Sequence, residues 1–343
     1  MLFNDFKNHY TFPMSAKEKH LVLASRREDD RKFFLEMSIR YGMRLTVPVT
    51  SDEMAAAVLS GGMLIMDAND SDFLTSKYIF SAPAVAQVLN ERVDPKQIFA
   101  LSDDYVYQDP NLRPPESEYT KRIHHNLLRK YTQPAAVDIY GRMFDASFCT
   151  EPPKLADFFA PNHKIQKITL QNSSQRRLAV EALQKITEGA ALSGRLASKL
   201  AQGADELLMN AIFDAPRDSM GRACRKEVDR TQNFELKDKD AVEFEIANDN
   251  HLVGVCVTDL YGSLGYKDIL RSLSVDYVTA KYNVKRDTLG AGLGIYQTTY
   301  NGVSTVYSVA ENRFTRAMIF FPAVKSNLDF KDSFEFMSYY FTA

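Results

Sequence analysis

The chain has few cysteines, and they form no pattern. Cys149, Cys224 and Cys256 are the three cysteines in 343 residues. None belongs to a CxxC pair or stands at the spacing from histidine that zinc sites use. We therefore expect neither a disulfide-stabilised secreted fold nor a zinc site. Scattered thiols fit a reducing compartment, so the sequence predicts a cytoplasmic protein.

Long apolar runs and an excess of charge of either sign are also missing. The opening MLFNDFKNHYTF has no apolar signal core, and no stretch approaches the length of a membrane span. The formal net charge is -2, so no basic field points to nucleic acid or an anionic membrane surface. Hydrophobic residues make up 45% and charged residues 25%, which is typical of a soluble globular protein. We expect neither nucleic acid nor a membrane as a partner.

The first half alternates short apolar runs with helical patterns. Strands alternating with helices predict an α/β domain with a parallel sheet, which we place at 1–150. Ser51 and Ser81 are the expected helix N-caps. A further helix is predicted over 119–131. The predicted strands are 20–25, 44–50, 61–68 and 97–103, and the helices between them are 29–42, 51–60 and 81–93.

A proline-rich segment separates this half from a different pattern. Residues 151–163 are predicted to be a linker, because prolines cluster there. Two amphipathic helices and several antiparallel strands follow, with NDN at 248–250 as a hairpin turn. We therefore expect an α/β sandwich at 164–325, with helices packed on a mixed, mostly antiparallel sheet. Residues 326–343 are expected to be a C-terminal tail.

The first motif that could carry chemistry is ADELLMNAIFDA, which starts at Ala204. Glu206 and Asn210 are four residues apart, so they share one face of a helix. Such a pair is often only a solvated helix surface. The functional interpretation is a magnesium site, in which Asn210 offers a neutral oxygen to a cation that takes its other ligands from phosphate and water. Glu206, one turn earlier, would polarise a hydroxyl nucleophile.

The second motif is VCVTDLYG, an apolar strand that ends in Asp259 and is followed by Gly262. An acidic residue at a strand end is often just a turn former. The functional interpretation is a carboxylate that accepts a hydrogen bond from an exocyclic amine, such as that of adenine. Gly262 would then let the base lie against the backbone.

The third motif is TLGAGLG, where Gly290, Gly292 and Gly294 precede an apolar helical stretch. The GxGxG spacing and the polar segment before it do not fit a dinucleotide fingerprint, and no Gly-Lys-Ser/Thr follows as in a P-loop. A flexible loop with a helix cap is one explanation. The other is a phosphate site, because free N–H groups and the helix dipole favour anions. The basic residues just before it are Lys281, Lys285 and Arg286.

In this order and at these spacings, the three motifs resemble the N, G1 and G2 boxes of the GHKL (histidine-kinase-like) ATPases. That superfamily groups gyrase, heat-shock chaperones, histidine kinases and mismatch-repair proteins. The resemblance implies ATP and Mg²⁺ as cofactors, with Glu206 as the catalytic base and Asn210 as the metal ligand. The implied nucleotide-binding residues are Asn210, Asp259, Gly262, Lys285, Gly290, Gly292, Gly294 and Thr315, the last standing where the family places a threonine or serine near the nucleotide.

Within the superfamily, residues 164–323 look most like the small bacterial anti-sigma-factor serine kinases. The resemblance implies phosphate transfer from Mg-ATP to a signalling partner, such as an anti-sigma-antagonist-like or response-regulator-like protein. Relatives of this kind often dimerise, so a homodimer is also expected. One departure is in DLYGSLG, where Tyr261 replaces the first glycine of the usual Asp-x-Gly-x-Gly box. This change alters the adenine pocket.

The first half resembles, more weakly, a response-regulator receiver domain. Asp67 ends the third predicted strand, where a receiver keeps its phosphorylated aspartate, and Ser102 ends the fourth, where the switch Ser/Thr lies. The acidic pair after the first strand is replaced by SRRE, and no lysine clearly ends a fifth strand. Asp67 is the candidate phosphoacceptor, but magnesium would have few ligands there. We interpret this half as a receiver-like module that binds a partner without being phosphorylated.

His124 and His125, in RIHHNLLRKY, fall on the predicted helix 119–131. A histidine kinase needs a phosphoacceptor histidine on a two-helix hairpin, and the usual proline and second helix are not evident. We interpret these histidines as surface or loop-adjacent residues.

Two functions stay open at this point. The chain is either an ATP-dependent serine/threonine kinase or a non-catalytic, nucleotide-responsive or scaffold module in a two-component-like pathway. The intact Glu206 and Asn210 favour the kinase, and the altered G1 box favours the module.

Overall fold

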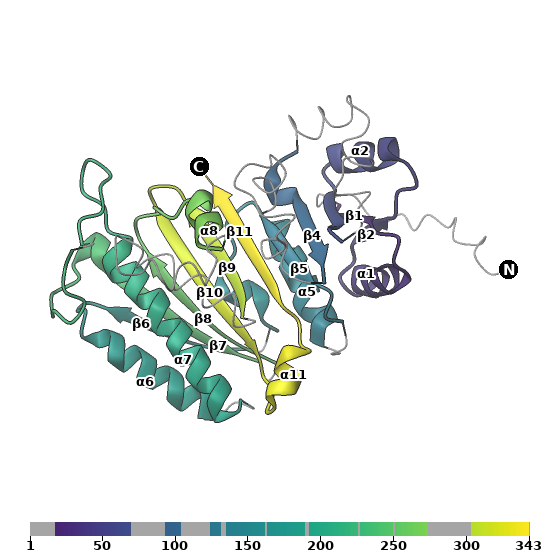
Figure 1. Cartoon of the computed structure of the whole chain (residues 1–343). Helices are drawn as coiled ribbons and strands as arrows, with labels where there is room; N and C mark the ends of the chain where they lie inside the picture. Colours follow the sequence, from purple (N-terminus) through teal and green to yellow (C-terminus); the bar gives the residue numbers. More distant parts are fainter. Residues whose placement is uncertain are drawn as a thin grey trace, which may run out of the picture.

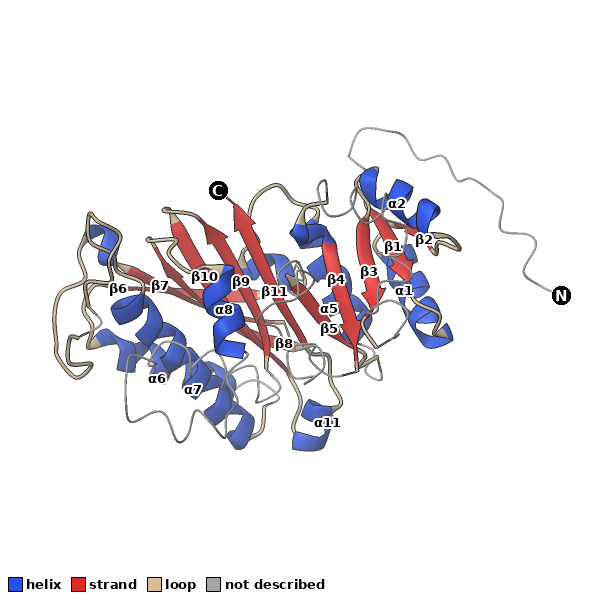
Figure 2. Cartoon of the chain, turned by 45° about the horizontal axis from the view of Figure 1, so that its top comes forward, coloured by secondary structure: helices blue, strands red, loops and turns tan. Residues whose placement is uncertain are grey.

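The computed structural model contains one continuous mixed sheet of 11 strands, in the order β2-β1-β3-β4-β5-β11-β9-β10-β8-β7-β6 (Figure 1). The fold class is thus α/β. The sheet runs through both halves of the chain, and helices lie on its two faces (Figure 2). The structure describes residues 18–69, 93–103, 124–131, 135–161, 163–188, 192–225, 227–249, 251–273 and 303–342.

The first half contributes the parallel part of the sheet. Its strands are β1 (His20–Ala24), β2 (Arg44–Thr46), β3 (Met63–Asp67), β4 (Ile98–Ser102) and β5 (His125–Leu128). Its helices are α1 (Glu28–Arg40), α2 (Ser51–Leu59) and α5 (Ala135–Ser147), with a short 3-10 turn η1 (Pro95–Gln97) before β4. Neighbouring strands from β2 to β5 all pair in parallel, so the predicted parallel sheet is confirmed.

The second half contributes antiparallel strands with two long helices. The strands are β6 (Lys164–Leu170), β7 (Val242–Asn248), β8 (Leu252–Asp259), β9 (Ser304–Ala310) and β10 (Phe314–Pro322). The helices are α6 (Gln175–Glu188), α7 (Gly194–Met209) and α8 (Tyr266–Leu273), with turns η4 (Leu155–Phe158), η5 (Asn210–Asp214) and η6 (Asp238–Asp240). Leucines of α6 and α7 pack on valines of β8 in one apolar cluster.

The expected C-terminal tail is wrong. Residues after β10 form α11 (Asn327–Lys331) and then β11 (Phe336–Thr342), which lies inside the sheet. β11 pairs antiparallel with β5 and parallel with β9, so it joins the two halves. The segment FMSYYFT is aromatic and almost wholly buried, which explains why it pairs rather than stays exposed.

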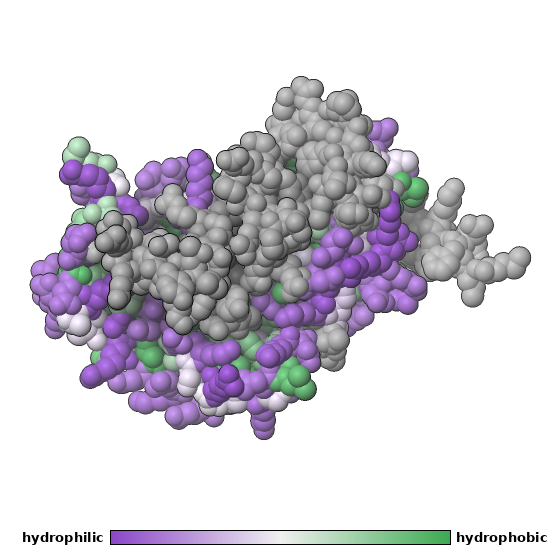
Figure 3. Space-filling model, in the orientation of Figure 1, coloured by the Kyte–Doolittle hydropathy of each residue, from purple (hydrophilic) through white to green (hydrophobic). Residues whose placement is uncertain are grey.

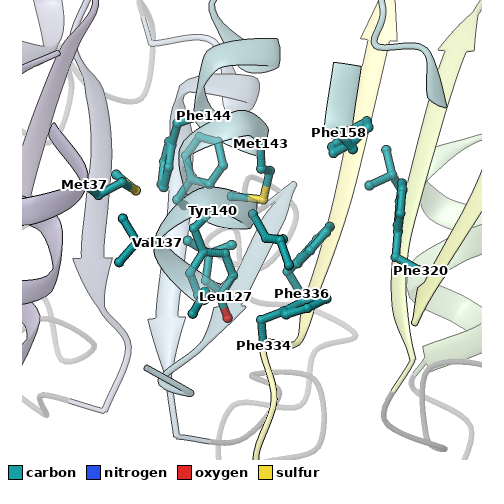
Figure 4. Packing of buried hydrophobic residues seen from close by; sticks show 14 of the residues in the cluster. Met37, Leu127, Val137, Tyr140, Met143, Phe144, Phe158, Phe320, Phe334 and Phe336 are labelled. Carbon is teal, nitrogen blue, oxygen red and sulfur yellow. The ribbon is translucent and has the colours of Figure 1, made fainter. Parts of the chain in front are cut away.

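The two predicted domains therefore share one sheet and one large apolar cluster, while each also has a cluster of its own. Figure 4 shows Met37, Tyr140 and Phe144 from the first half packed in the same cluster as Phe320 and Phe336 from the second. The predicted linker 151–163 takes part in this core through Leu155, Phe158 and Phe159, each at most 5% exposed. The prolines of 151–163 mark the change of sequence pattern between the two halves, but the segment is not an exposed linker.

Two local predictions are also wrong. The part of 119–131 that the structure describes is not helical, because His125–Leu128 form strand β5. The N-cap of α2 is Thr50 and not Ser51, since the Thr50 side chain accepts a hydrogen bond from the Glu53 N–H. Ser81 and the helix predicted at 81–93 fall almost wholly outside the described residues.

No helix in the described ranges is long and apolar enough to cross a membrane. The longest of them, α7, has 16 residues. In Figure 3 the surface over α6 and α7 is mostly hydrophilic, with isolated hydrophobic residues. Leu178 of α6 is an exposed hydrophobic residue, with 58% of its surface exposed.

Candidate functional site

Helix α7 places Glu206 and Asn210 one turn apart on the same face. The helix starts at the N-cap Ser193, whose hydroxyl accepts from the Leu196 N–H. The buried face of α7 packs on the sheet, and Gly203 allows close approach, because a Cβ there would lie 2.7 Å from Ile319 Cδ1 of β10. Glu206 and Asn210 are both half-buried. The side chains predicted to act together thus sit at the end of α7, close to the sheet.

The helix widens at its end into a π turn. Asn210–Asp214 forms η5, in which the Ala215 N–H donates to the Asn210 carbonyl at 2.8 Å. π turns are rare and recur at functional sites. Side chains from other segments cap the carbonyls of this turn, since Arg225 donates to the Ile212 carbonyl at 3.3 Å. The end of α7 is therefore fixed in place by its surroundings.

Asp259 ends β8 and is only 7% exposed. Burial raises the pKa of its carboxyl to about 6, while hydrogen bonds from backbone N–H groups such as that of Tyr261 and the charge of Arg217 act in the opposite direction. The Tyr261 N–H donates to Asp259 Oδ1 at 2.8 Å. Thr315 of β10 is buried and pairs directly with Asp259 across the sheet. Asp259 and Thr315 therefore place two buried polar residues opposite each other on the neighbouring strands β8 and β10.

Gly262, in the turn after Asp259, has little free space beside it. Gly262 has φ +60, and a Cβ there would lie 2.1 Å from the Ala310 carbonyl oxygen. The free space beside this glycine is thus occupied by the β9–β10 turn, whose Asn312 N–H donates to the Gly262 carbonyl at 3.4 Å. The Cβ side of Gly262 is therefore filled by the protein's own backbone, and the expectation that Gly262 lets a base lie against the backbone stays a prediction.

Tyr261, at the altered position of the box, is anchored away from Asp259. Its hydroxyl donates to Asp240 of η6, and the Lys239 ammonium lies 4.7 Å from the centre of its ring. Asp240 is also ion-paired with Arg225. The side chain is therefore held by a charged network that reaches the π turn of α7 through Arg225.

One hydrogen bond ties together the segments that carry the first two motifs. The Ser263 hydroxyl donates to the Ala215 carbonyl at 3.1 Å, which ties the turn after β8 to the end of η5. The charge of Arg217, just beyond η5, opposes the rise that burial causes in the pKa of Asp259. The segment that follows Asn210 and the turn that follows Asp259 therefore meet in one corner.

Glu206 lies among charged neighbours. Burial is the main cause that raises the pKa of its carboxyl, and Asp205 adds to it, while Arg230 and Arg176 act the other way. Arg176 is paired with Asp205 at 3.3 Å and Arg230 with Asp214 at 3.5 Å. A half-buried carboxylate with a raised pKa is suited to proton transfer.

The third motif is not described. Gly290, Gly292, Gly294 and Lys285 lie in 274–302, outside the described residues. The structure thus pairs Asp259 with Thr315 and ties the segment after Asn210 to the turn after Asp259. The predicted phosphate loop lies outside the described residues and stays a prediction.

In the first half, Asp67 ends β3 and is paired with a residue that sequence reasoning missed. The Arg129 guanidinium, just after β5, forms an ion pair with Asp67 and with Asp30 of α1. Ser102, which ends β4, accepts a hydrogen bond from the Asn126 amide at 2.9 Å. Arg129 was missed because HHNLLRKY was assigned to a helix. The apolar pair Leu127 and Leu128, followed by two basic residues, was the available signal for a short strand with a cation at its end.

The expectation for the histidines is wrong for His125, which is 0% exposed on β5 with its ring stacked on Phe99 at 4.2 Å. His124 lies just before β5 and is half-buried, with its ring centre 4.2 Å from that of Tyr266. Burial lowers the pKa of His124 to about 4 and that of His125 well below its usual value. Only the His125 ring is thus fully part of the packed interior.

A magnesium ion would depend on the nucleotide for most of its ligands. Within the described ranges, no group of three His, Cys, Asp or Glu side chains is arranged to hold a metal. Asn210 is the one predicted protein ligand, which fits a cation that takes its other oxygens from phosphate and water. For ATP, the buried carboxyl of Asp259 beside Thr315 fits a base with an exocyclic amine. The space beside Gly262 is filled by the protein itself and leaves no room for the base there.

Comparison with known proteins adds no family to this geometry. No protein-family model matches the chain, and no curated protein matches its sequence.

Proposed function

We propose that the second half of the chain binds Mg-ATP and transfers its terminal phosphate to a serine or threonine of a signalling partner. The observation that carries the proposal is the corner at the end of α7, where Asn210 and Asp259 belong to segments tied by the Ser263–Ala215 hydrogen bond. The substrate class follows from Glu206, because a carboxylate one turn before the metal ligand can take the proton of a hydroxyl.

Each residue has a distinct role in this proposal. Asp259 accepts a hydrogen bond from the exocyclic amine of the base. Asn210 contributes an oxygen ligand to the magnesium ion. Mg-ATP supplies the phosphoryl group and the metal charge that phosphoryl transfer requires. Glu206 orients and deprotonates the attacking hydroxyl, and its raised pKa brings it closer to neutral pH, where a base of this kind is efficient.

A second candidate is a non-catalytic module that holds a signalling partner. The observations that favour it are the Gly262 backbone packed on the β9–β10 turn and the Tyr261 hydroxyl held by Asp240. Both reduce the room for a base beside Asp259. In this case the corner is a structural element, and the shared sheet is the scaffold that carries a binding surface.

Calorimetry with ATP and magnesium separates the two. The kinase proposal predicts saturable binding by the wild type, weaker binding by Asp259→Asn, and loss of the magnesium dependence in Asn210→Ala. Asp229→Asn is a matched control, because it makes the same change as Asp259→Asn at an exposed aspartate outside the three motifs. Absence of binding by the wild type would leave the module as the function.

Catalysis needs its own test. Labelled ATP and a lysate are incubated with wild type and with Glu206→Gln, which keeps the size of the side chain. We expect labelling of a partner protein to fall by ~10²–10⁴-fold in the variant while ATP still binds. Equal labelling by both proteins would remove Glu206 from the mechanism.

A further inference from the structure

Exposed apolar side chains gather in one short segment of the first half, which the proposed function does not use. Four of the eleven large hydrophobic side chains that are exposed in the described part of the chain lie between residues 35 and 49. Leu35 and Ile39 of α1 are 52% and 74% exposed, and Val47 and Val49, which follow β2, are 37% and 80% exposed. Single exposed apolar residues need no explanation, but several within one segment indicate a contact surface.

This segment lies at the end of the sheet that β2 forms. β2 is the first strand in the sheet order and pairs only with β1 among the described strands. Figures 1 and 2 show β2 at this outer end, and α1 packs beside it. α5 lies along the opposite flank of α1, because the Arg40 guanidinium pairs with Asp138 of α5 at 3.0 Å. Leu35 is about 140° round the helix from Arg40, so it points away from α5 and toward the β2 edge.

The two edges of the sheet differ in whether they can pair with a copy of themselves. β6, at the other edge, has Lys167 as its central residue. Antiparallel pairing of two β6 strands about this residue sets two lysines opposite each other, which is unfavourable. β2 has Leu45 at its centre, so the same kind of pairing sets Arg44 of each copy opposite Thr46 of the other. The β2 edge therefore permits self-pairing, whereas the β6 edge disfavours it.

We propose that Leu35, Ile39 and the open edge of β2 form a contact surface for a second copy of this chain, with the two copies related by a twofold axis. In such a contact the same surface meets itself. The axis sets β2 antiparallel to β2 of the copy and α1 antiparallel to α1 of the copy. Leu35 and Ile39 then meet the same side chains of the other copy and are removed from water. Because β2 is short, the two helices supply most of the apolar contact.

The charges of α1 fit an antiparallel contact between two copies. The first turn of the helix carries Glu28 and Asp29, and the last turn carries Arg40. Antiparallel packing brings the acidic start of each helix toward the basic end of the other and also sets their dipoles antiparallel. Glu28 and Lys32, whose side chains are 79% and 69% exposed, form an ion pair at 2.8 Å and supply a polar rim. The surface thus complements a second copy better than a partner of one charge sign.

Sedimentation velocity of the full chain, from about 1 to about 200 µM, tests the association. We expect the wild type to form dimers as its concentration rises. Leu35→Glu places two like charges in the contact and should raise the dissociation constant at least ~10-fold. Leu178→Glu is the matched control, because it adds the same charge at a 58% exposed leucine of α6, outside this surface, and should dimerise like the wild type. A wild type that stays monomeric, or equal association of Leu35→Glu and Leu178→Glu, overturns the proposal.

A disulfide trap then locates the contact. Cys149 and Cys224 are exposed, so both are first replaced by serine. In this background we expect Leu35→Cys to form a cross-linked dimer under mild oxidation, because the twofold axis brings the two thiols together. Leu178→Cys should stay uncross-linked. Both positions are exposed, so the substitutions leave the core intact, and circular dichroism checks the fold. Failure of Leu35→Cys to cross-link, or equal cross-linking by Leu178→Cys, overturns the proposed surface.

Discussion

His125 and Asp259 show how buried titratable residues make the stability of this molecule depend on pH. Neither ring nitrogen of His125 has a hydrogen-bond partner, and burial lowers its pKa well below 6.5. Burial has the opposite effect on an acid, raising the pKa of Asp259 from 3.8 to about 6. The two residues therefore shift the stability of the fold in opposite directions as the pH falls.

For the histidine, the unfolded chain binds a proton near pH 6.5 and the folded chain does not. Stability is therefore lost as the pH falls below that value, by up to about 1.4 kcal/mol per pH unit. We expect His125→Phe, which keeps a ring on Phe99, to lose less stability than the wild type between about pH 7 and about pH 5. Urea unfolding at both pH values measures this. Equal losses in both proteins would contradict it.

For the aspartate, the folded chain binds its proton more readily than the unfolded chain between pH 6 and 3.8. Stability from this residue is therefore gained as the pH falls through that window. We expect Asp259→Asn, which cannot titrate, to be stabilised less than the wild type on going from about pH 7 to about pH 5, so its net loss of stability is larger. The same urea series measures it, and an unchanged difference between the two proteins would contradict the assigned pKa.

Gly262 is restricted by both its conformation and its neighbours. A Cβ would lie 2.1 Å from the Ala310 carbonyl oxygen at φ +60. We expect Gly262→Ala to lower the free energy of unfolding by more than about 2 kcal/mol. Gly221 has φ +76 with nothing within 4 Å of its Cβ position, so Gly221→Ala tests the backbone conformation alone. Equal losses in the two variants would show that the contact with the turn has no energetic role.

At the scale of elements, the sequence predicted the strands that are buried on both faces and missed those with an atypical pattern. β1 and β3 are buried throughout and apolar except for His20 and Asp67 at one end, as is typical of strands in a parallel sheet, so continuous apolar runs identified them. β5 is only HNLL, next to charged residues, and resembles a helix end. β11 lies beyond the last motif of the resemblance, so nothing indicated its partners, which are far away in the sequence. Long-range pairing leaves no local signal.

The candidate site was predictable to a similar extent. Glu206 and Asn210 follow from helical periodicity, and Asp259 from the end of an apolar strand. The π turn and the contact of Gly262 with the β9–β10 turn depend on tertiary packing, so no local pattern indicated them.

The start of helix α2 allows a direct test of which residue is its N-cap. The Thr50 hydroxyl accepts from the Glu53 N–H at 3.2 Å, whereas Ser51 is the first residue of the helix. We expect Thr50→Ala to lower the free energy of unfolding by about 1 kcal/mol and Ser51→Ala to change it by less than about 0.5 kcal/mol. Chemical denaturation of the two variants measures both. A larger loss in Ser51→Ala would reverse the assignment.

At the scale of the whole molecule, β11 joins the two halves of the chain, which differ in sequence pattern, into one folded unit. It pairs with β5 through residues 336–338 and with β9 through residues 337–342. The Lys130 ammonium is ion-paired with Glu335, and the Tyr140 hydroxyl donates to the Glu335 carbonyl at 3.1 Å, so side chains reinforce the same junction. A sheet that is continuous across this junction favours cooperative unfolding.

Calorimetry tests this cooperativity. We expect a single heat-absorption peak whose calorimetric and van't Hoff enthalpies agree, because the shared core must be lost as a whole. Met337 is 0% exposed at the centre of the junction, and Met337→Ala should lower the midpoint without splitting the peak. Two separate peaks in the wild type, or two stable fragments after cleavage near 149–164, would contradict this.

The position of β11 also bears on how the chain is made. During synthesis the ribosome releases β5 long before β9, and β11 only after both. Until then the nascent first half carries a bare strand edge at β5, with its amide and carbonyl groups open to other chains. Completing the sheet means closing a loop from Leu128 to Phe336, a slow kind of step that exposes such edges to aggregation. Newly made molecules of this protein should therefore need protection by chaperones until translation has passed β11.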